Sequence, residues 1–299
     1  MSLAQDSGQE TDGPREKSAV FVGLARDCAA QLPYVLDNIR VMAGFFGKTA
    51  FVFAENDSRD ATAEVLDAFA AQRPDCHVLN FDGIPQSLPE RTRRFAYLRN
   101  RCIAFIRADP RLRGYDYLIV LDMDDVNRDP LDASAVAKAL QFLAAGDDTA
   151  GVFPNCRGIY YDMWTLREPN LCPGDVWEEQ LDYVLAHQVD DMTAYKKTFA
   201  PRLFQLAETA PPLAVASAFG GLAIYKLRYA LKAEYKGFKP KEAMQAGVKR
   251  HFRFQVCEHV AFNADITSRG GKLYILPFFV NRITAGIEFS ETAYRSLIF

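Results

Sequence analysis

The sequence lacks three features that would each point to a particular class of protein. Its 35 Lys and Arg residues face 38 Asp and Glu residues, so it has no basic excess of the kind that marks most nucleic-acid-binding proteins. No apolar run approaches the roughly 18–20 residues that span a bilayer. None of the six cysteines forms a Cys-x-x-Cys pair, which argues against a disulfide scaffold or a zinc ribbon. We therefore expect a cytoplasmic protein with buried thiols, no nucleic-acid partner and no integral membrane segment.

The sequence also lacks an internal repeat and a low-complexity linker. Residues 1–18 are polar and have no apolar signal core, and they are expected to form a solvated tail. Residues 19–299 are then expected to form a single domain.

Apolar segments of strand length alternate with amphipathic segments along most of this domain. This alternation is typical of an α/β fold with a mainly parallel sheet and helical crossovers. Strands are predicted at residues 19–25, 48–54, 77–81, 115–121, 150–153 and 273–280, and helices at 29–42, 61–71, 91–107, 133–145 and 257–265. Residues 216–225 form an apolar segment with a glycine pair at its centre.

Three carboxylates, Asp122, Asp124 and Asp125, follow the clearest predicted strand, residues 115–121. Ligands of open α/β sheets bind at the carboxyl ends of the strands. Because crowded carboxylates repel one another, a divalent cation is their natural partner, and Mg²⁺ prefers one or two carboxylates with substrate phosphates completing its shell. A helix N-cap followed by a solvated turn is the alternative interpretation.

Two further polar segments also allow both a functional and a purely structural interpretation. Glu55, Asn56 and Asp57 follow another predicted strand and could hydrogen-bond a nucleotide, although an Asx turn that opens a helix would also explain them. Arg99 stands on a basic helix, where its guanidinium suits a phosphate group. The alternative is that it belongs to the solvated face of that helix.

The order of four segments, VFVGLARD, AENDSRDAT, YLRNRC and YDYLIVLDMDD, resembles the GT-A class of glycosyltransferases. The acidic turn AENDSRDAT and the segment Tyr161-Asp-Met-Trp-Thr-Leu-Arg167 are also similar to the fungal capsule-associated mannosyltransferase-like group. The resemblance covers roughly residues 20–262. Its specificity lies in the order of the motifs, because each motif is short.

This resemblance implies a single Rossmann-like GT-A domain in which residues 19–130 bind the nucleotide and residues 131–299 bind the acceptor. The implied activity is metal-dependent transfer of a sugar from a nucleoside diphosphate sugar to a hydroxyl acceptor, with Mn²⁺ or Mg²⁺ as cofactor. The resemblance assigns donor binding to Arg26, Glu55, Asn56, Asp57, Arg99, Asp122, Gly220 and Gly221. It assigns metal binding to Asp122 and Asp124. From the residues themselves, His259 is predicted as a further metal ligand, and Tyr161, Asp162 and Trp164 are predicted to bind the acceptor.

The segment Cys257-Glu-His-Val260 falls where many inverting members of the class carry a Glu-Asp pair with the catalytic base. Because His259 replaces the Asp, Glu258 is the only carboxylate left for that role. Glu258 could instead be an ordinary first-turn residue favoured by the helix dipole, and His259 a packed core histidine. Likewise, the aromatic side chains at residues 160–164 could plug the core, and the basic segment 236–253 could be either a flap over the diphosphate or a solvated face.

Two other function classes remain open from the sequence. The Asp-x-Asp of Asp122 and Asp124 also resembles that of haloacid dehalogenase-like phosphatases, in which the nucleophilic Asp normally follows the first strand. The other class is a catalytically idle relative that binds nucleotide sugars without turning them over.

Overall fold

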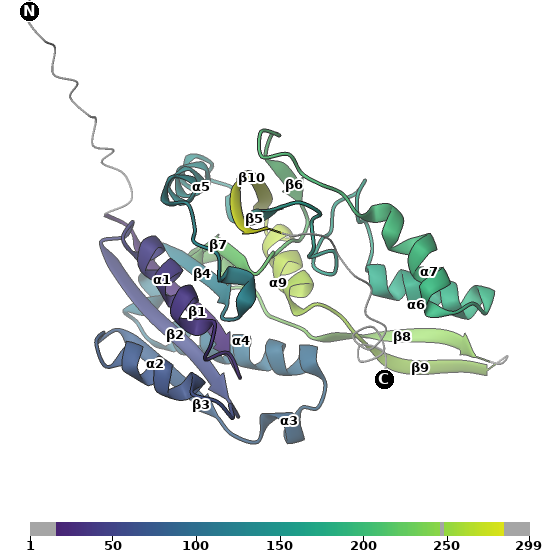
Figure 1. The fold of residues 1–299 in the computed structure, drawn as a ribbon, viewed down its shortest axis with the longest axis horizontal. Helices are drawn as coiled ribbons and strands as arrows, with labels where there is room; N and C mark the ends of the chain where they lie inside the picture. The colour runs from purple at the N-terminus through teal and green to yellow at the C-terminus, as the bar shows by residue number, and fades with distance from the viewer. Residues whose placement is uncertain (1–15, 246–247, 284–299) are drawn as a thin grey trace, which may run out of the picture.

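A computed structural model describes residues 16–245 and 248–283, so most of the predicted tail lies outside the described residues. An eight-stranded sheet with the order β3-β2-β1-β4-β7-β5-β10-β6 forms its centre (Figure 1). The strands of this sheet are β1 (Ser18–Ala25), β2 (Lys48–Asn56), β3 (Cys76–Phe81), β4 (Tyr117–Asp122), β5 (Thr149–Arg157), β6 (Leu213–Val215), β7 (Leu222–Lys226) and β10 (Lys272–Ile283). A separate antiparallel hairpin consists of β8 (Phe238–Gln245) and β9 (Val248–Gln255).

The sheet is mainly parallel, which confirms the predicted fold class. Strands β3, β2, β1 and β4 run parallel to one another, and β5 runs parallel to β10. Only β7 and β6 pair antiparallel with their neighbours. Leu24 at the end of β1 pairs with Asp122 of β4, and Ala25 pairs with Glu55 of β2. The two acidic turns therefore emerge from the same edge of the sheet, as the sequence predicts.

Helices cover both faces of the sheet (Figure 1). Successive strand residues point to opposite faces, and β1 shows the consequence, because Phe21 packs in one buried cluster while Val20 and Val22 pack in the other. The Phe21 cluster includes residues of α1 (Leu32–Ala43), α2 (Thr62–Ala70) and α5 (Ala133–Ala145). The other cluster includes residues of α4 (Arg91–Ala108), α6 (Val176–His187), α7 (Asp191–Thr198), α8 (Leu227–Ala230) and α9 (Glu258–Thr267). The short helix α3 (Ile84–Ser87) precedes α4.

The predicted and observed elements differ most in the second half of the chain. The predicted strand 150–153 extends as far as Arg157, and within the apolar segment 216–225 the strand β7 begins at Leu222. Helices α6 and α7 lie outside the predicted elements. Each has a sequence signal at its N-terminus, because Asp175 and Asp190 cap these helices by accepting backbone N–H hydrogen bonds.

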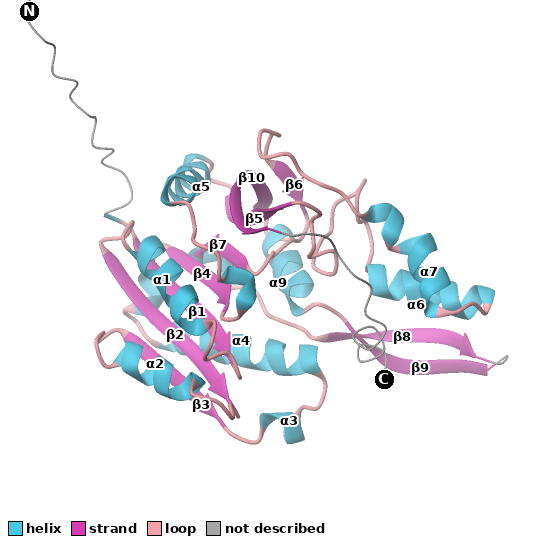
Figure 2. Cartoon of the chain, viewed as in Figure 1, coloured by secondary structure: helices cyan, strands magenta, loops and turns pink. Residues whose placement is uncertain are grey.

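The basic segment 236–253 forms most of the β8–β9 hairpin, which extends beside α6 (Figure 2). Lys239 and Lys241 of β8 pair with Glu178 of α6, and Lys241 also lies 2.7 Å from Asp182. At its base, the backbone carbonyl of Gly237 accepts a hydrogen bond from Thr92 of α4 at 2.6 Å. The lysines of β8 thus hold the hairpin against a helix.

The helices within residues 16–245 and 248–283 are all too short or too polar to cross a bilayer.

Candidate functional site

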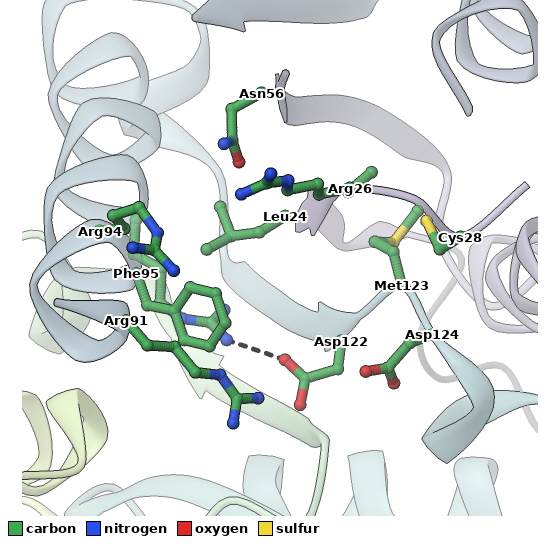
Figure 3. A pocket seen from close by; sticks show the side chains of 12 residues that line it. Leu24, Arg26, Cys28, Asn56, Arg91, Arg94, Phe95, Asp122, Met123 and Asp124 are labelled. Carbon is green, nitrogen blue, oxygen red and sulfur yellow. Dashed lines mark hydrogen bonds and ion pairs between the residues drawn. The ribbon is translucent and has the colours of Figure 1, made fainter. Parts of the chain in front are cut away.

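A cavity of about 300 Å³ opens at the carboxyl ends of β1, β2 and β4, beside the first two turns of α4 (Figure 3). It brings together five of the predicted site residues, which come from four different elements or their adjoining turns. The residues that line it are Leu24, Ala25, Arg26, Cys28, Asn56, Arg91, Arg94, Phe95, Arg99, Asp122, Met123 and Asp124.

Reciprocal hydrogen bonds fix the two loops that form one wall of this cavity. After β1, the backbone N–H groups of Cys28 and Ala29 donate to Thr62 Oγ1 at 2.9 Å and Asp60 Oδ2 at 3.0 Å. In the opposite direction, the N–H of Arg59 donates to Asp27 Oδ1 at 2.7 Å. The position of the loop that carries Arg26 is therefore tied to the turn after β2.

Of the three polar residues predicted after β2, only Asn56 lines the cavity. The buried Glu55 accepts a hydrogen bond from the N–H of Ser58 at 2.9 Å. Asp57 has a positive φ of 52° and accepts from the N–H groups of Gly83 and Ile84 at 2.7 and 3.2 Å. Glu55 and Asp57 thus shape the turn, and their contact with a nucleoside stays a prediction.

Asp122 and Asp124 lie side by side in the cavity wall (Figure 3). Asp122 Oδ1 accepts a hydrogen bond from Arg99 Nη2 at 2.8 Å. Asp124 Oδ1 accepts from the N–H of Val126 at 3.2 Å, which caps a 3₁₀ turn. Burial, with Asp124 adding to it and Arg99 opposing it, raises the pKa of Asp122 to about 7. Crowding two carboxylates here is unfavourable, and a positive ion would relieve it.

The third carboxylate of the predicted cluster turns away from the first two. Asp125 does not line the cavity, and its Oδ2 lies 3.5 Å from Arg282 Nη2 of β10. Asp125 is therefore a natural control for the roles of Asp122 and Asp124.

Gly220 and Gly221 support the acidic turn from behind and do not line the cavity. The carbonyl of Gly221 accepts from the N–H of Asp122 at 2.9 Å and from Asn127 Nδ2 at 2.6 Å. Gly221 has a φ of +79°, and a Cβ there would lie 2.1 Å from Val126 Cγ1. Only glycine satisfies both constraints. The structure thus gives the glycine pair a positioning role, and its predicted contact with the donor stays a prediction.

Arg99 joins the cavity to the interior of the protein. Its side chain is 3% exposed and connects two carboxylates, with Nη2 on Asp122 and Nε 3.1 Å from Glu258 Oε1. The guanidinium carbon lies 5.2 Å from the ring centroid of Phe219 and 5.9 Å from that of Tyr235. Although burial opposes it, the pKa of Arg99 is raised by the charges of Asp122 and Glu258. Arg99 is thus a permanent cation that holds Asp122 in place.

Glu258 and His259 begin α9 and are both buried. The guanidinium group of Arg99 lies between Glu258 and Asp122 and forms an ion pair with each of them. The His259 ring stacks on Phe219 with centroids 3.7 Å apart, and its Nε2 lies 3.7 Å from Glu258 Oε1, too far for a hydrogen bond. Burial lowers the pKa of His259 well below its usual value. The structure does not bring His259 to the cavity with Asp122 and Asp124, and its packing matches the core alternative.

The three predicted acceptor residues pack behind the cavity, and none of them lines it. Asp162 accepts from the N–H of Gly220 at 2.8 Å and from Thr165 Oγ1 at 2.7 Å. The Tyr161 ring lies 5.4 Å from the guanidinium carbon of Arg282. Trp164 Nε1 is buried and has no hydrogen-bond partner among the described residues. Acceptor binding by these residues stays a prediction.

Seven of the twelve lining residues are absent from the sequence-based assignment, and three of these seven lie on α4, namely Arg91, Arg94 and Phe95. Arg91, Phe95 and Arg99 are spaced by four residues, so they share one face of α4. This spacing is the signal that could have identified them.

The donor atoms of the cavity fit a metal ion that shares its shell with a substrate. Among residues 16–245 and 248–283, no three His, Cys, Asp or Glu side chains converge as a complete metal site. Asp122 and Asp124 nevertheless supply two neighbouring carboxylates on the wall of an open cavity. Mg²⁺ is typically held by one or two carboxylates together with substrate phosphates.

Comparison with solved structures gives matches of low sequence identity. No known protein family and no curated protein matches the chain. The S. aureus TarS 1–349 structure is similar with 11% identity and a TM-score of 0.46, covering 88% of this chain and 59% of that one. The mannosyltransferase PcManGT from Pyrobaculum calidifontis, in complex with GDP-Man and Mn²⁺, has 15% identity and a TM-score of 0.48, covering 95% and 61%. Glucosyl-3-phosphoglycerate synthase from Mycobacterium tuberculosis, in complex with UDP, has 13% identity and a TM-score of 0.44, covering 93% and 74%.

The chain thus spans about three fifths of the length of the first two of these structures. Identities this low and TM-scores below 0.5 carry no weight in assigning a ligand. The assignment must rest on the residues of the cavity, and the narrower resemblance to the fungal capsule-associated group stays a prediction.

Proposed function

We propose that this chain is a glycosyltransferase whose cavity binds a nucleoside diphosphate sugar and that it transfers the sugar to a hydroxyl acceptor. The observation that carries the proposal is the composition of the cavity. Two carboxylates, Asp122 and Asp124, share about 300 Å³ with four arginines at the carboxyl ends of three parallel strands. Carboxylates suited to a divalent cation and guanidinium groups suited to phosphate oxygens together match a metal–diphosphate.

Asp122 and Asp124 are the residues that would hold a Mn²⁺ or Mg²⁺ ion. When bound, such an ion would neutralise negative charge on the departing diphosphate. Arg99 orients Asp122 through its 2.8 Å hydrogen bond, and the carbonyl of Gly221 fixes the backbone of the same residue.

Glu258 is proposed to accept the proton of the acceptor hydroxyl if the transfer inverts the sugar. Its support is its place beside Asp122, since one guanidinium group bonds both carboxylates. Glu258 is 4% exposed, so the acceptor must approach through a rearrangement of the surrounding side chains. Hydrogen bonds of catalytic groups often tighten only in the substrate complex.

The phosphatase interpretation has no support in this arrangement. The nucleophilic Asp of haloacid dehalogenase-like enzymes normally follows the first strand, whereas Asp122 ends β4. A catalytically idle relative would bind the nucleotide sugar in the same cavity. It would differ from the proposed enzyme only in not transferring the sugar.

Incubation of the chain with UDP- and GDP-sugars and Mn²⁺ tests the function directly. We expect slow release of nucleoside diphosphate and free sugar from one donor, and faster release with a suitable acceptor. Nucleotide binding without turnover on any acceptor would support the idle relative. Phosphate release from simple esters, with no release of nucleoside diphosphate, would support the phosphatase.

The metal role of the two carboxylates gives a second prediction. Mn²⁺ is expected to tighten nucleoside diphosphate binding roughly tenfold or more. Two unit charges about 4 Å apart attract each other by about 1 kcal/mol in water and about 4 kcal/mol near a protein surface, and each ~1.4 kcal/mol changes the affinity tenfold. Asp124→Ala should abolish this gain, and calorimetry with and without chelator measures it.

Asp125→Ala is the matched control, because Asp125 belongs to the same turn and pairs with Arg282 outside the cavity. It should keep the gain from Mn²⁺. Equal affinity of the unmodified chain in chelator and in Mn²⁺ would contradict a metal role for Asp122 and Asp124.

A further inference from the structure

Three arginines of the cavity wall belong neither to the carboxylate pair Asp122 and Asp124 nor to their neighbour Arg99. Arg26 extends from the end of β1, and Arg91 and Arg94 extend from the first turn of α4 into the same space (Figure 3). We call these three residues the arginine wall. They come from two segments more than 60 residues apart in the sequence, so only the fold brings them together.

The arginine wall has too few negative partners. Arg26 Nε lies 3.4 Å from Asp27 Oδ2, a half-exposed pair. Arg91 and Arg94 have no carboxylate within ion-pair distance among the described residues. Arg99, by contrast, bonds both Asp122 and Glu258. The uncompensated positive charge of the cavity therefore lies on the arginine wall, away from Arg99.

Neighbouring groups hold two of these guanidinium groups in place. Arg94 Nη1 donates to the carbonyls of Leu88 and Pro89, the former at 3.1 Å, and the guanidinium carbon of Arg91 lies 5.0 Å from the ring centroid of Phe95. Burial, with the neighbouring charges of Arg26 and Arg91, lowers the pKa of Arg94. Like charges are thus held close together around open space, which is favourable only when an anion lies between them.

The charge balance identifies the anion. In the acidic half of the site, Asp122, Asp124 and Glu258 face the single cation Arg99, so a divalent ion there would balance the protein's own carboxylates. The two negative charges that a diphosphate adds then have no partner in that half. Arg26, Arg91 and Arg94 supply three positive charges, which Asp27 and the more distant charges of Asp57 and Glu90 offset only in part.

We propose that the arginine wall is a phosphate subsite that binds the diphosphate of the donor directly, without a divalent cation. This inference rests on the proposed function for the identity of the donor. Guanidinium groups suit this role, because their planar arrays of N–H donors match the geometry of phosphate oxygens. Donor binding then has two separable parts, a metal-dependent part at Asp122 and Asp124 and a metal-independent part at the arginine wall.

Binding of inorganic pyrophosphate to the full chain in the presence of chelator tests the subsite. We expect the unmodified chain to bind pyrophosphate by calorimetry under these conditions. The double variant Arg91→Gln/Arg94→Gln should bind at least about tenfold more weakly, since hydrogen bonds to charged groups typically contribute that much or more. Its affinity should also depend less steeply on salt concentration.

The control Arg101→Gln/Arg113→Gln removes the same net charge from exposed positions outside the cavity. It should change pyrophosphate affinity by less than about twofold, because both side chains are exposed and make no contact with the cavity, and salt screens exposed charges. If the Arg91/Arg94 variant does not fold, Arg26→Gln tests the same wall from β1 and should show the same loss. Pyrophosphate binding that requires Mn²⁺, or equal affinity of the wall and control variants, would overturn the subsite.

The two proposals fail in different ways. Pyrophosphate binding in chelator by a chain that turns over no nucleotide sugar would retain the subsite and remove the glycosyltransferase function. Sugar transfer by a chain that binds pyrophosphate only with Mn²⁺ would do the reverse.

Discussion

Arg99→Met is expected to lower the free energy of unfolding by about 3–5 kcal/mol, the typical cost of removing one partner from a buried ion pair. Arg99 is 2% exposed, and its guanidinium bonds Asp122 and Glu258. Methionine retains much of the side-chain volume but leaves both carboxylates without their cation. Urea denaturation followed by circular dichroism measures the loss.

The triple variant Arg99→Met/Asp122→Asn/Glu258→Gln is the control for this prediction. Because it removes all three charges together, no buried charge is left unpaired, and replacing a whole buried charge network is often close to neutral. We expect it to recover most of the lost stability, and the difference measures the coupling among the three residues. A urea midpoint for Arg99→Met equal to that of the unmodified chain would show that Arg99 does not stabilise this network.

The first half of the fold could be predicted because its signals are local. Apolar runs such as residues 48–54 alternate with amphipathic helices, and the parallel sheet places their polar ends at one edge. The prediction that the turns after β2 and β4 share that edge follows from this rule alone, and the pairing of Leu24 with Asp122 and of Ala25 with Glu55 confirms it.

The remainder of the site depends on contacts that are distant in sequence. Arg99 and Glu258 are 159 residues apart, and Gly220 meets Asp162 across 58 residues. No local pattern indicates which carboxylate a given arginine will face. The sequence therefore led to separate predictions for Arg99, as a donor-binding residue, and for Glu258, as a base, without their shared ion pair.

The side of α4 that faces the cavity could not be predicted from the sequence for a related reason. From the sequence, a charge run on a helix is more often its solvated face. Here Arg91 and Arg94 line the cavity, whereas Arg101 on the same helix does not. Only the packing of α4 against β1 and β2 decides which arginines meet the cavity.

Glu258→Gln is expected to lower turnover by about 10²–10⁴-fold, the typical contribution of general-base catalysis. Glutamine retains the shape of the side chain, and its carbonyl oxygen can still accept the hydrogen bond from Arg99 Nε that Glu258 Oε1 accepts at 3.1 Å. It cannot take the proton of an acceptor hydroxyl. Steady-state kinetics with the identified donor and acceptor measures the loss, and product anomer analysis establishes whether the transfer inverts.

Donor affinity separates a base from a structural carboxylate. Glu258 does not line the cavity, so a base role predicts that nucleoside diphosphate binding stays close to that of the unmodified chain while kcat falls. If Glu258 served only as a counter-ion for Arg99, Asp122-dependent metal binding would fall, and kcat would follow it. A folded Glu258→Gln variant that turns over at the rate of the unmodified chain would remove this residue from the mechanism, because glutamine cannot accept the proton of the acceptor hydroxyl.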